Sequence, residues 1–201
     1  MPMPISRRWF LSSALAAGLL PSRQALALLG EPFPVFESDA KQIPYKFRRR
    51  DVDYKTAEPA GTLILDAKRR FLYLVLGDGK ATRYGVSVGK KGWLWIGETV
   101  IKRMEKWPVW VPTPEHLAAQ PALAKHTHGM PGGLGNPMGA RAMYLYQGDV
   151  DTVNRIHGTI EPSLIGRPDT LGCIGLLNID VIHLYDRVQI GTRVVALPPG
   201  A

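Results

Sequence analysis

The single cysteine of this chain, Cys173, has the side chain whose type points most directly to chemistry. It lies in the segment Asp169-Thr170-Leu171-Gly172-Cys173-Ile174, between a polar stretch and the last expected helix. A thiolate is a strong nucleophile, whereas a free Cys is often only a small buried hydrophobic residue. Gly172 permits the backbone dihedral angles with which a loop directs N–H groups at an oxyanion. The residues alone leave both interpretations of Cys173 open, a nucleophile and a packing residue.

A nucleophilic cysteine needs a base within hydrogen-bond reach, and histidine is a common one. His157 is the best placed, because it ends an expected strand and is followed by the loop residues Gly158 and Thr159. His126 and His128 alternate along an extended segment, which is also how a pair of metal ligands looks. With one Cys and no companion cluster at ligand spacing, we predict no metal site. The two other histidines lie in expected helices: His116 and His183.

Short strands would have to position these side chains. Runs rich in branched and aromatic residues, separated by turns with Gly and Asp, predict many strands and few helices. This pattern favours one mainly-β domain of the sandwich or barrel type with one or two short helices. Strands are expected over residues 45–54 (an edge strand), 62–66, 70–76, 84–88, 93–103, 140–147, 152–157 and 193–197.

Two helices are marked by the residues at their starts. Thr113 is expected to cap a helix over residues 114–120, with Pro at its first helical position. Asn178 is expected to cap the last helix, which has Asp180 in its first turn and an apolar stripe along one side. A Gly/Pro-rich loop over residues 129–139 is a candidate lid over the site, and a plain structural loop is the alternative.

The first 27 residues have the features of an export signal. Ser6-Arg7-Arg8-Trp9-Phe10-Leu11 is a twin-arginine pattern, a mostly apolar run follows it, and Ala25-Leu26-Ala27 fits a signal-peptidase site. We expect cleavage after Ala27 and a protein of the periplasm or the exterior. The remaining chain is expected to consist of an N-terminal extension over residues 28–60 and one domain over residues 61–201.

The composition excludes several classes of protein. One Cys rules out a disulfide framework within the chain and any metal site with several Cys ligands. No apolar run reaches the ~20 residues of a membrane span. Without the signal, which holds three Arg and no acidic residue, the remaining 174 residues have 22 Lys and Arg against 17 Asp and Glu. This modest basic excess, without a nucleic-acid-binding module, suits an anionic polymer of the cell envelope.

Several segments together resemble one known family. His157-Gly158-Thr159, then Thr170-Leu171-Gly172-Cys173, then Asn178 form a pattern similar to that of the L,D-transpeptidase catalytic domain family (YkuD type, ErfK/YbiS/YcfS/YnhG-like). The likeness extends from about residue 61 to residue 197. Further matching segments are Trp95-Ile96-Gly97, Glu105-Lys106-Trp107-Pro108, Asn136-Pro137-Met138-Gly139-Ala140-Arg141-Ala142 and the closing helix Asp180 to Val188.

The resemblance implies roles for particular residues. Cys173 would be the nucleophile and His157 its general base. The backbone N–H groups of Gly172 and Cys173 would form the oxyanion hole, and either Thr170 or a backbone carbonyl would orient His157. No metal or organic cofactor is implied. The residues expected to bind substrate are Gly158, Thr159, Arg141 and Asn178.

The resemblance also implies a reaction. The thiol would attack the carbonyl of the third residue in a peptidoglycan tetrapeptide stem and release the terminal D-Ala. The acyl group would then pass to an amine of a neighbouring stem, to a lipoprotein lysine or to water. The partners expected are therefore peptidoglycan stems and an envelope lipoprotein, with no nucleic acid and no integral membrane span.

Two residues depart from the family pattern. Leu171 stands where relatives often have His, and Gly175 stands where they usually have Arg. Gly cannot hold a substrate carboxylate with the two-pronged contact of a guanidinium. A catalytically weakened cell-wall binding module therefore remains a second hypothesis, and an L,D-carboxypeptidase or a lipoprotein-attaching enzyme remains a third. Arg141, Arg155 and Arg167 are the candidates for a compensating charge.

Overall fold

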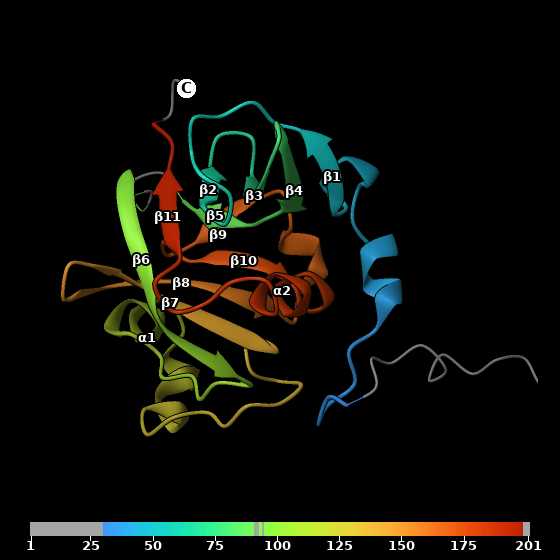
Figure 1. Cartoon of the computed structure of the whole chain (residues 1–201). Helices are drawn as coiled ribbons and strands as arrows, with labels where there is room; N and C mark the ends of the chain where they lie inside the picture. The colour runs from blue at the N-terminus through green and yellow to red at the C-terminus, as the bar shows by residue number, and fades with distance from the viewer. Residues whose placement is uncertain (1–29, 91–92, 94, 199–201) are drawn as a thin grey trace, which may run out of the picture.

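The computed structural model describes residues 30–90, 93 and 95–198 (Figure 1). The expected export signal, residues 1–27, lies outside the described residues. None of the helices that the structure describes is long and apolar enough to cross a membrane.

Most of the chain forms one nine-stranded mixed sheet with the order β1-β4-β3-β2-β11-β6-β7-β8-β10. The pairs β2–β11 and β8–β10 are parallel, and the other neighbours are antiparallel. A separate parallel pair consists of β5 and β9. The strands are β1 (Arg50–Asp53), β2 (Leu63–Asp66), β3 (Phe71–Gly77), β4 (Lys80–Gly85), β5 (Val88–Gly89), β6 (Gly97–Lys106), β7 (Arg141–Gln147), β8 (Val150–Thr159), β9 (Pro168–Thr170), β10 (Ile174–Leu177) and β11 (Arg193–Ala196).

The sheet curls around its own core. One apolar cluster joins residues of β2, β3 and β4 to residues of β8, β10 and the last helix; its members include Leu63, Leu72, Tyr84, Ile156, Ile174 and Leu184. Beyond the end of β4, Ser87 forms an isolated bridge with Gly175 of β10, so the two halves of the sheet also meet through backbone hydrogen bonds. The mainly-β, sandwich- or barrel-like fold with two short helices is therefore confirmed.

Two α-helices accompany the sheet, together with short 3-10 turns. Thr113 caps α1 as predicted, since its side chain accepts the backbone N–H of His116. The cap predicted for α2 is wrong: Leu177 is the N-cap, and the Asn178 side chain instead accepts the backbone N–H of Ala140 at 2.8 Å. The helices are α1 (Pro114–Ala119), α2 (Asn178–Tyr185) and the 3-10 turns Glu37–Lys41, Tyr45–Phe47, Pro121–His126 and Pro162–Leu164.

Three strand predictions need new bounds. The strand predicted over residues 84–88 breaks after Gly85, because the chain there turns to form the Ser87–Gly175 bridge, and β5 begins only at Val88. The strand predicted over residues 93–103 starts later and extends further, as β6. Of residues 45–54 only Arg50–Asp53 is a strand, and it does lie at the sheet edge, as predicted.

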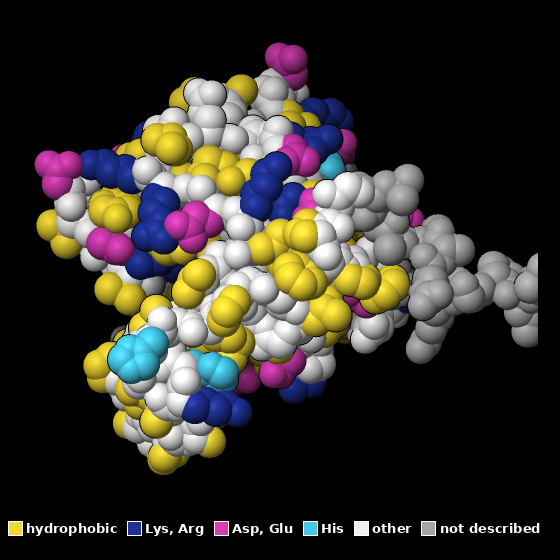
Figure 2. Space-filling model, turned by 90° about the horizontal axis from the view of Figure 1, so that it is seen from below, with side chains coloured by type: hydrophobic (Ala, Val, Ile, Leu, Met, Phe, Trp, Pro, Cys, Tyr) yellow, Lys and Arg dark blue, Asp and Glu magenta, His cyan; other side chains and the backbone are white. Residues whose placement is uncertain are grey.

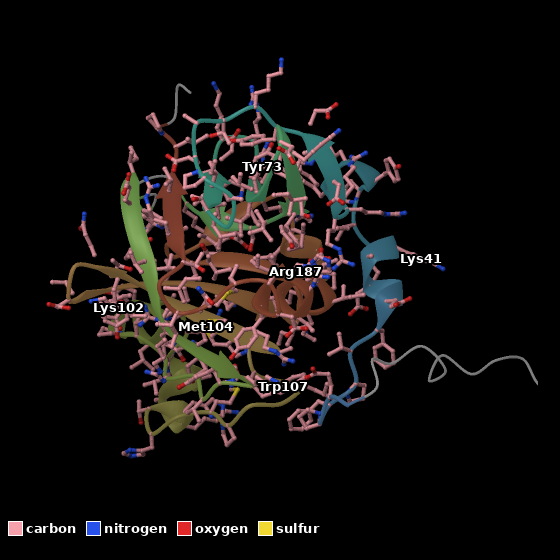
Figure 3. All side chains as sticks on the ribbon, viewed as in Figure 1. Lys41, Tyr73, Lys102, Met104, Trp107 and Arg187 are labelled. Atoms are coloured by element: carbon pink, nitrogen blue, oxygen red, sulfur yellow. The ribbon has the colours of Figure 1, made fainter. Side chains whose placement is uncertain are left out.

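The residues before β1 pack against the domain as a strap (Figure 1, blue). Val35, Ile43 and Phe47 are buried in it. Near its start, Glu31 accepts hydrogen bonds from the Trp107 indole and the Arg141 guanidinium. Figure 3 shows Trp107 at the end of β6, beside this segment. The strap therefore anchors the point at which the chain leaves β6.

Candidate active site

The parallel pair β8–β10 brings the two predicted catalytic residues together. Ile156 pairs with Ile174 and His157 with Gly175, and Cys173 directly precedes this register. Because side chains alternate along a strand and both isoleucines point into the core, His157 and Cys173 lie on the opposite face together. Neighbouring strands lie about 4.8 Å apart and rise about 3.3 Å per residue. Cys173 lies opposite Arg155, two residues before His157, so the Cα atoms of His157 and Cys173 are roughly 8 Å apart. An imidazole and a thiol can span this gap.

His157 is held in one tautomer. Its Nδ1 atom lies 2.5 Å from the carbonyl oxygen of Gly158. A carbonyl oxygen can only accept, so Nδ1 carries the proton and Nε2 keeps its lone pair free for the thiol. Desolvation by burial lowers the pKa of His157 to about 4, despite the opposing effect of the Gly158 contact. The imidazole is therefore a neutral base over the physiological pH range.

Cys173 is half-buried, with its sulfur 4.0 Å from the carbonyl oxygen of Val153. Desolvation raises the pKa of the thiol, and the backbone N–H and the guanidinium of Arg155 act in the opposite direction. The resting pair is therefore a neutral thiol beside a neutral imidazole. Such a pair reacts by transferring the thiol proton to histidine as the nucleophile attacks.

The turn before Cys173 has a glycine in the left-handed region and two backbone N–H groups without an acceptor in the described part of the chain. Gly172 has a φ of +109°, a conformation in which L side chains are strained, and a Cβ there would lie 2.5 Å from the Asn154 side-chain oxygen. Among the described residues, no acceptor takes the backbone N–H of Gly172 or Cys173. These two N–H groups are thus free to donate to an oxygen that develops negative charge.

Thr170 braces this turn rather than the imidazole. Its hydroxyl donates to the carbonyl oxygen of Cys173 at 2.6 Å. Of the two orienting partners expected for His157, the structure shows the backbone carbonyl, that of Gly158. Thr170 therefore fixes the backbone at Cys173, directly before β10.

Gly158 and Asn178 are closely packed against each other next to His157. A Cβ on Gly158 would lie 2.2 Å from the Asn178 side-chain oxygen, which accepts the N–H of Ala140. Asn178, the first residue of α2, therefore holds the start of β7 by a hydrogen bond and packs against the end of β8. Thr159 is buried, and its hydroxyl accepts the N–H of Glu161. These contacts position the loop after His157, and binding of substrate by these three residues stays a prediction.

Arg141 is not brought to the pair. Its neighbour Ala142 pairs with His157, so the Arg141 side chain extends from the other face of the sheet. There it is 3% exposed, forms an ion pair with Glu31 and lies over the Tyr185 ring. It is buried on the face away from His157, which gives no support to the predicted contact with substrate.

The chain between β6 and β7, residues 107–140, folds as a lobe beside the site. Trp110 and Met130 form an isolated bridge, and the buried Asn136 amide donates to three carbonyls of this lobe. Met138 and Trp110 pack with Ala142 and Tyr144, the face that carries His157. The predicted loop over residues 129–139 is therefore held by hydrogen bonds and apolar contacts on the side of the sheet that carries His157.

The lobe also carries His116, whose ring meets Trp110 edge-on at 5.4 Å. Its proximity contributes to the lowered pKa of His157. Figure 2 shows histidine side chains gathered on this lobe next to a basic side chain. The sequence predicts His116 only as a helix residue, because nothing local signals that its charge acts on His157.

The position that departs from the family pattern, Gly175, is enclosed. A Cβ on Gly175 would lie 2.4 Å from the hydroxyl oxygen of Ser87, which is 1% exposed. Ser87 and Gly175 exchange two backbone hydrogen bonds, of 2.9 and 3.1 Å. In this chain, the bridge that closes the sheet thus fills the space that a longer side chain at residue 175 would need.

No group of three or more His, Cys, Asp or Glu side chains within residues 30–90, 93 and 95–198 is arranged to hold a metal ion. Two histidines of this region are held by contacts within the protein. His157 is bonded to Gly158, and His116 to Thr113.

Comparison with known proteins gives related domains. The curated relatives include "Probable L,D-transpeptidase ErfK/SrfK" of Salmonella typhimurium, 32% identical over 139 residues, and "Probable L,D-transpeptidase YbiS" of Escherichia coli K12, 30% identical over 141 residues. Each match covers 67% of this chain and 43% of the relative, so the chain spans less than half the length of these two relatives.

A solved structure from Brucella melitensis is also similar. It is described as a "Probable carnitine operon oxidoreductase caia", is 46% identical, and covers 80% of this chain and 99% of its own, with a TM-score of 0.53. That description names another activity than those of the two curated relatives. The model of the YkuD L,D-transpeptidase catalytic domain matches residues 60–195, which include every residue of the site described above. The chain therefore belongs to the YkuD-type L,D-transpeptidase catalytic domain family.

Proposed function

We propose that this protein is a peptidoglycan L,D-transpeptidase that uses Cys173 as nucleophile and His157 as general base. The observation that carries the proposal is the pairing of β8 with β10, which sets both side chains on one face with the imidazole locked as the Nδ1–H tautomer. The family membership supports the substrate class, the tetrapeptide stem of peptidoglycan.

The geometry supports the following sequence of steps. Nε2 of His157 takes the thiol proton while the sulfur attacks the carbonyl carbon of the third stem residue. The tetrahedral oxyanion accepts hydrogen bonds from the N–H groups of Gly172 and Cys173. The protonated imidazole then gives its proton to the nitrogen of the leaving D-Ala, which leaves a thioester on Cys173.

The second half repeats these steps with an acceptor. His157 takes a proton from the attacking amine or water, the carbonyl re-forms, and the sulfur leaves and is reprotonated. A neighbouring stem as acceptor gives a cross-link, a lipoprotein lysine gives an attached lipoprotein, and water gives a tripeptide stem. We favour the neighbouring stem, and we place the protein in the periplasm or outside the cell, exported by the twin-arginine signal of residues 1–27.

Product analysis tests this proposal. The purified protein and its Cys173→Ala variant are incubated with disaccharide-tetrapeptide stems, and the products are followed by mass spectrometry. The proposal predicts release of D-Ala by the unmodified protein only, and the mass of the second product identifies the acceptor. Release of D-Ala at equal rates by both proteins would contradict it.

One observation favours a second candidate, a cell-wall binding module with weakened catalysis. Gly175 provides no cationic side chain toward the site, and Ser87 blocks the space beside it. This candidate predicts that the protein sediments with peptidoglycan sacculi, yet neither releases D-Ala nor forms a thioester. Release of D-Ala that depends on Cys173 would exclude it.

A further inference from the structure

Strand β8 has an irregular stretch directly beside the nucleophile. Tyr144 of β7 pairs with Arg155, and Tyr146 pairs with Asp151, so three residues of β8 stand opposite one residue of β7. In this bulge Val153 has a φ of +61°, which is rare for a branched side chain. Bulges of this kind often re-aim groups next to active sites.

The Asp151 carboxylate ties the bulge together. Its two oxygens accept hydrogen bonds from the two terminal nitrogens of Arg155, at 2.7 and 2.8 Å. One of these oxygens also accepts the backbone N–H of Val153 at 2.8 Å. We refer to this arrangement of Asp151, Val153 and Arg155 as the clasp. It fixes the strained residue and the guanidinium with the same carboxylate.

The guanidinium of the clasp is also held from the side. It lies 4.5 Å from the centre of the Tyr144 ring, and its side chain is 14% exposed. Arg103, on the strand at the other side of β7, lies 4.1 Å from the same ring and pairs with Glu105. The Tyr144 hydroxyl donates to Glu105 at 2.9 Å. Tyr144 thus has a paired arginine from each neighbouring strand, and only one of the two is next to the thiol.

Three residues of the bulge, Val153, Asn154 and Arg155, lie beside Cys173 or the turn that precedes it. The Val153 carbonyl oxygen is 4.0 Å from the sulfur. The Asn154 side-chain oxygen fills the space beside Gly172, in the turn that presents the thiol. Arg155 stands two residues before His157 on the same face, abreast of Cys173 in the register of β8 and β10. Against the effect of burial, the Arg155 guanidinium lowers the pKa of the Cys173 thiol.

We propose that the clasp is a positioning device, in which Asp151 and Tyr144 hold the Arg155 guanidinium as the fixed positive charge that stabilises the Cys173 thiolate. This proposal deepens the proposed function, on which it rests. Among the described residues, other charged or titratable groups stand on the elements around the thiol. They are His157 on β8, Asp151 in the bulge, the ion pair of Lys90 with Asp169 where β5 meets β9, and His116 on α1, which acts on His157.

Alkylation of Cys173 by iodoacetamide across pH tests the proposal without any peptidoglycan. The variants are Arg155→Met, which removes the charge, and Arg155→Lys, which keeps it. Arg103→Met is the matched control, since Arg103 stacks on the same ring and pairs with a carboxylate, but away from the thiol. Circular dichroism checks that each variant is folded. If Arg155→Met is not, Arg155→Gln replaces it, because Gln is also neutral but can still donate a hydrogen bond to Asp151.

The expected result is an upward shift of about one pH unit in the alkylation midpoint for the neutral variants, as for loss of a nearby opposite charge. At pH 7 alkylation should be about three- to tenfold slower, because less thiolate is present and its higher nucleophilicity offsets only part of the loss. Arg155→Lys should recover at least half of the shift, and Arg103→Met should match the unmodified protein. An unchanged midpoint in the folded neutral variant, or an equal shift in Arg103→Met, would overturn the proposal. Failure of the proposed function would appear separately, as absence of D-Ala release from the unmodified protein.

Discussion

Replacing Gly158 by Ala puts a methyl group where the structure has no room for one. The new carbon would lie 2.2 Å from the Asn178 side-chain oxygen, 3.0 Å from the Ala140 nitrogen and 3.2 Å from the Gly139 Cα. Asn178 must then move away, and the N–H of Ala140 loses its acceptor. Because the Gly158 carbonyl orients His157, this crowding also displaces the base.

The size of the effect follows from these contacts. Crowding of a close-packed site costs about 1–3 kcal/mol. A buried N–H left without an acceptor costs about 1–3 kcal/mol more. We therefore expect Gly158→Ala to lower the free energy of unfolding by about 2–6 kcal/mol. Asn178→Ala removes the same hydrogen bond without crowding and should cost about 1–3 kcal/mol.

Urea unfolding of the two single variants and the double variant measures the coupling. Once the Asn178 amide is gone, the new methyl group meets fewer atoms, so the double variant should be more stable than the sum of the single effects predicts, by at least 1 kcal/mol. Gly135→Ala is the matched control, since a Cβ there meets nothing within 4 Å, and it should change stability by less than about 0.5 kcal/mol. If Gly158→Ala is as stable as Gly135→Ala, or if the two effects are strictly additive in the cycle, this account of the packing between Gly158 and Asn178 is refuted.

Three other predictions follow from the structure. Burial lowers the pKa of His157 to about 4, so the base stays unprotonated above about pH 5, and the acid limb of kcat/KM for D-Ala release should lie near pH 4; a limb at pH 6–7 would contradict this. Gly175→Arg should lower the free energy of unfolding by about 1–3 kcal/mol because its Cβ meets the Ser87 hydroxyl, and Ser87→Gly in the same chain should restore at least half of it in urea unfolding. Glu31→Gln leaves the buried Arg141 guanidinium without a counter-charge and should cost about 3–5 kcal/mol in the same assay; a loss below 1 kcal/mol would show that the strap does not depend on this pair.

The sequence predicts those parts of the site that can be recognised from residue type and spacing within a short segment. A lone Cys after Gly172 and a His at the end of a strand stand out by residue type and spacing, and the structure places them on neighbouring strands. The start of α1 could also be predicted, because Thr113 and Pro114 determine it through contacts within one turn.

What the sequence did not reveal depends on partners far along the chain. The sequence predicts Asn178 as a helix cap because that role needs only local residues, but its side-chain oxygen accepts the N–H of Ala140, 38 residues away. Arg141 was expected at the substrate, and its partner is Glu31, 110 residues away. Strand β10 was not predicted, since its four residues directly precede a helix and have no alternating pattern.

The clasp illustrates the same limit. Asp151 and Arg155 lie four residues apart, a spacing that suggests an ion pair only within a helix. Here a bulge in a strand brings them together, and their closeness to Cys173 depends on the pairing of β8 with β10. Only the assembled sheet shows that this ion pair borders the nucleophile.

The central claim is that Cys173 is acylated with His157 as its base, and time-resolved mass spectrometry of the intact protein tests it most directly. The unmodified protein, Cys173→Ala and His157→Gln are mixed with disaccharide-tetrapeptide and quenched in acid at short intervals. We predict an adduct with the mass of the disaccharide-tripeptide acyl group on the unmodified protein, no adduct on Cys173→Ala, and formation at least 100-fold slower on His157→Gln, in line with the loss of a general base. An adduct that persists in Cys173→Ala, or that forms equally fast in His157→Gln, would contradict the account.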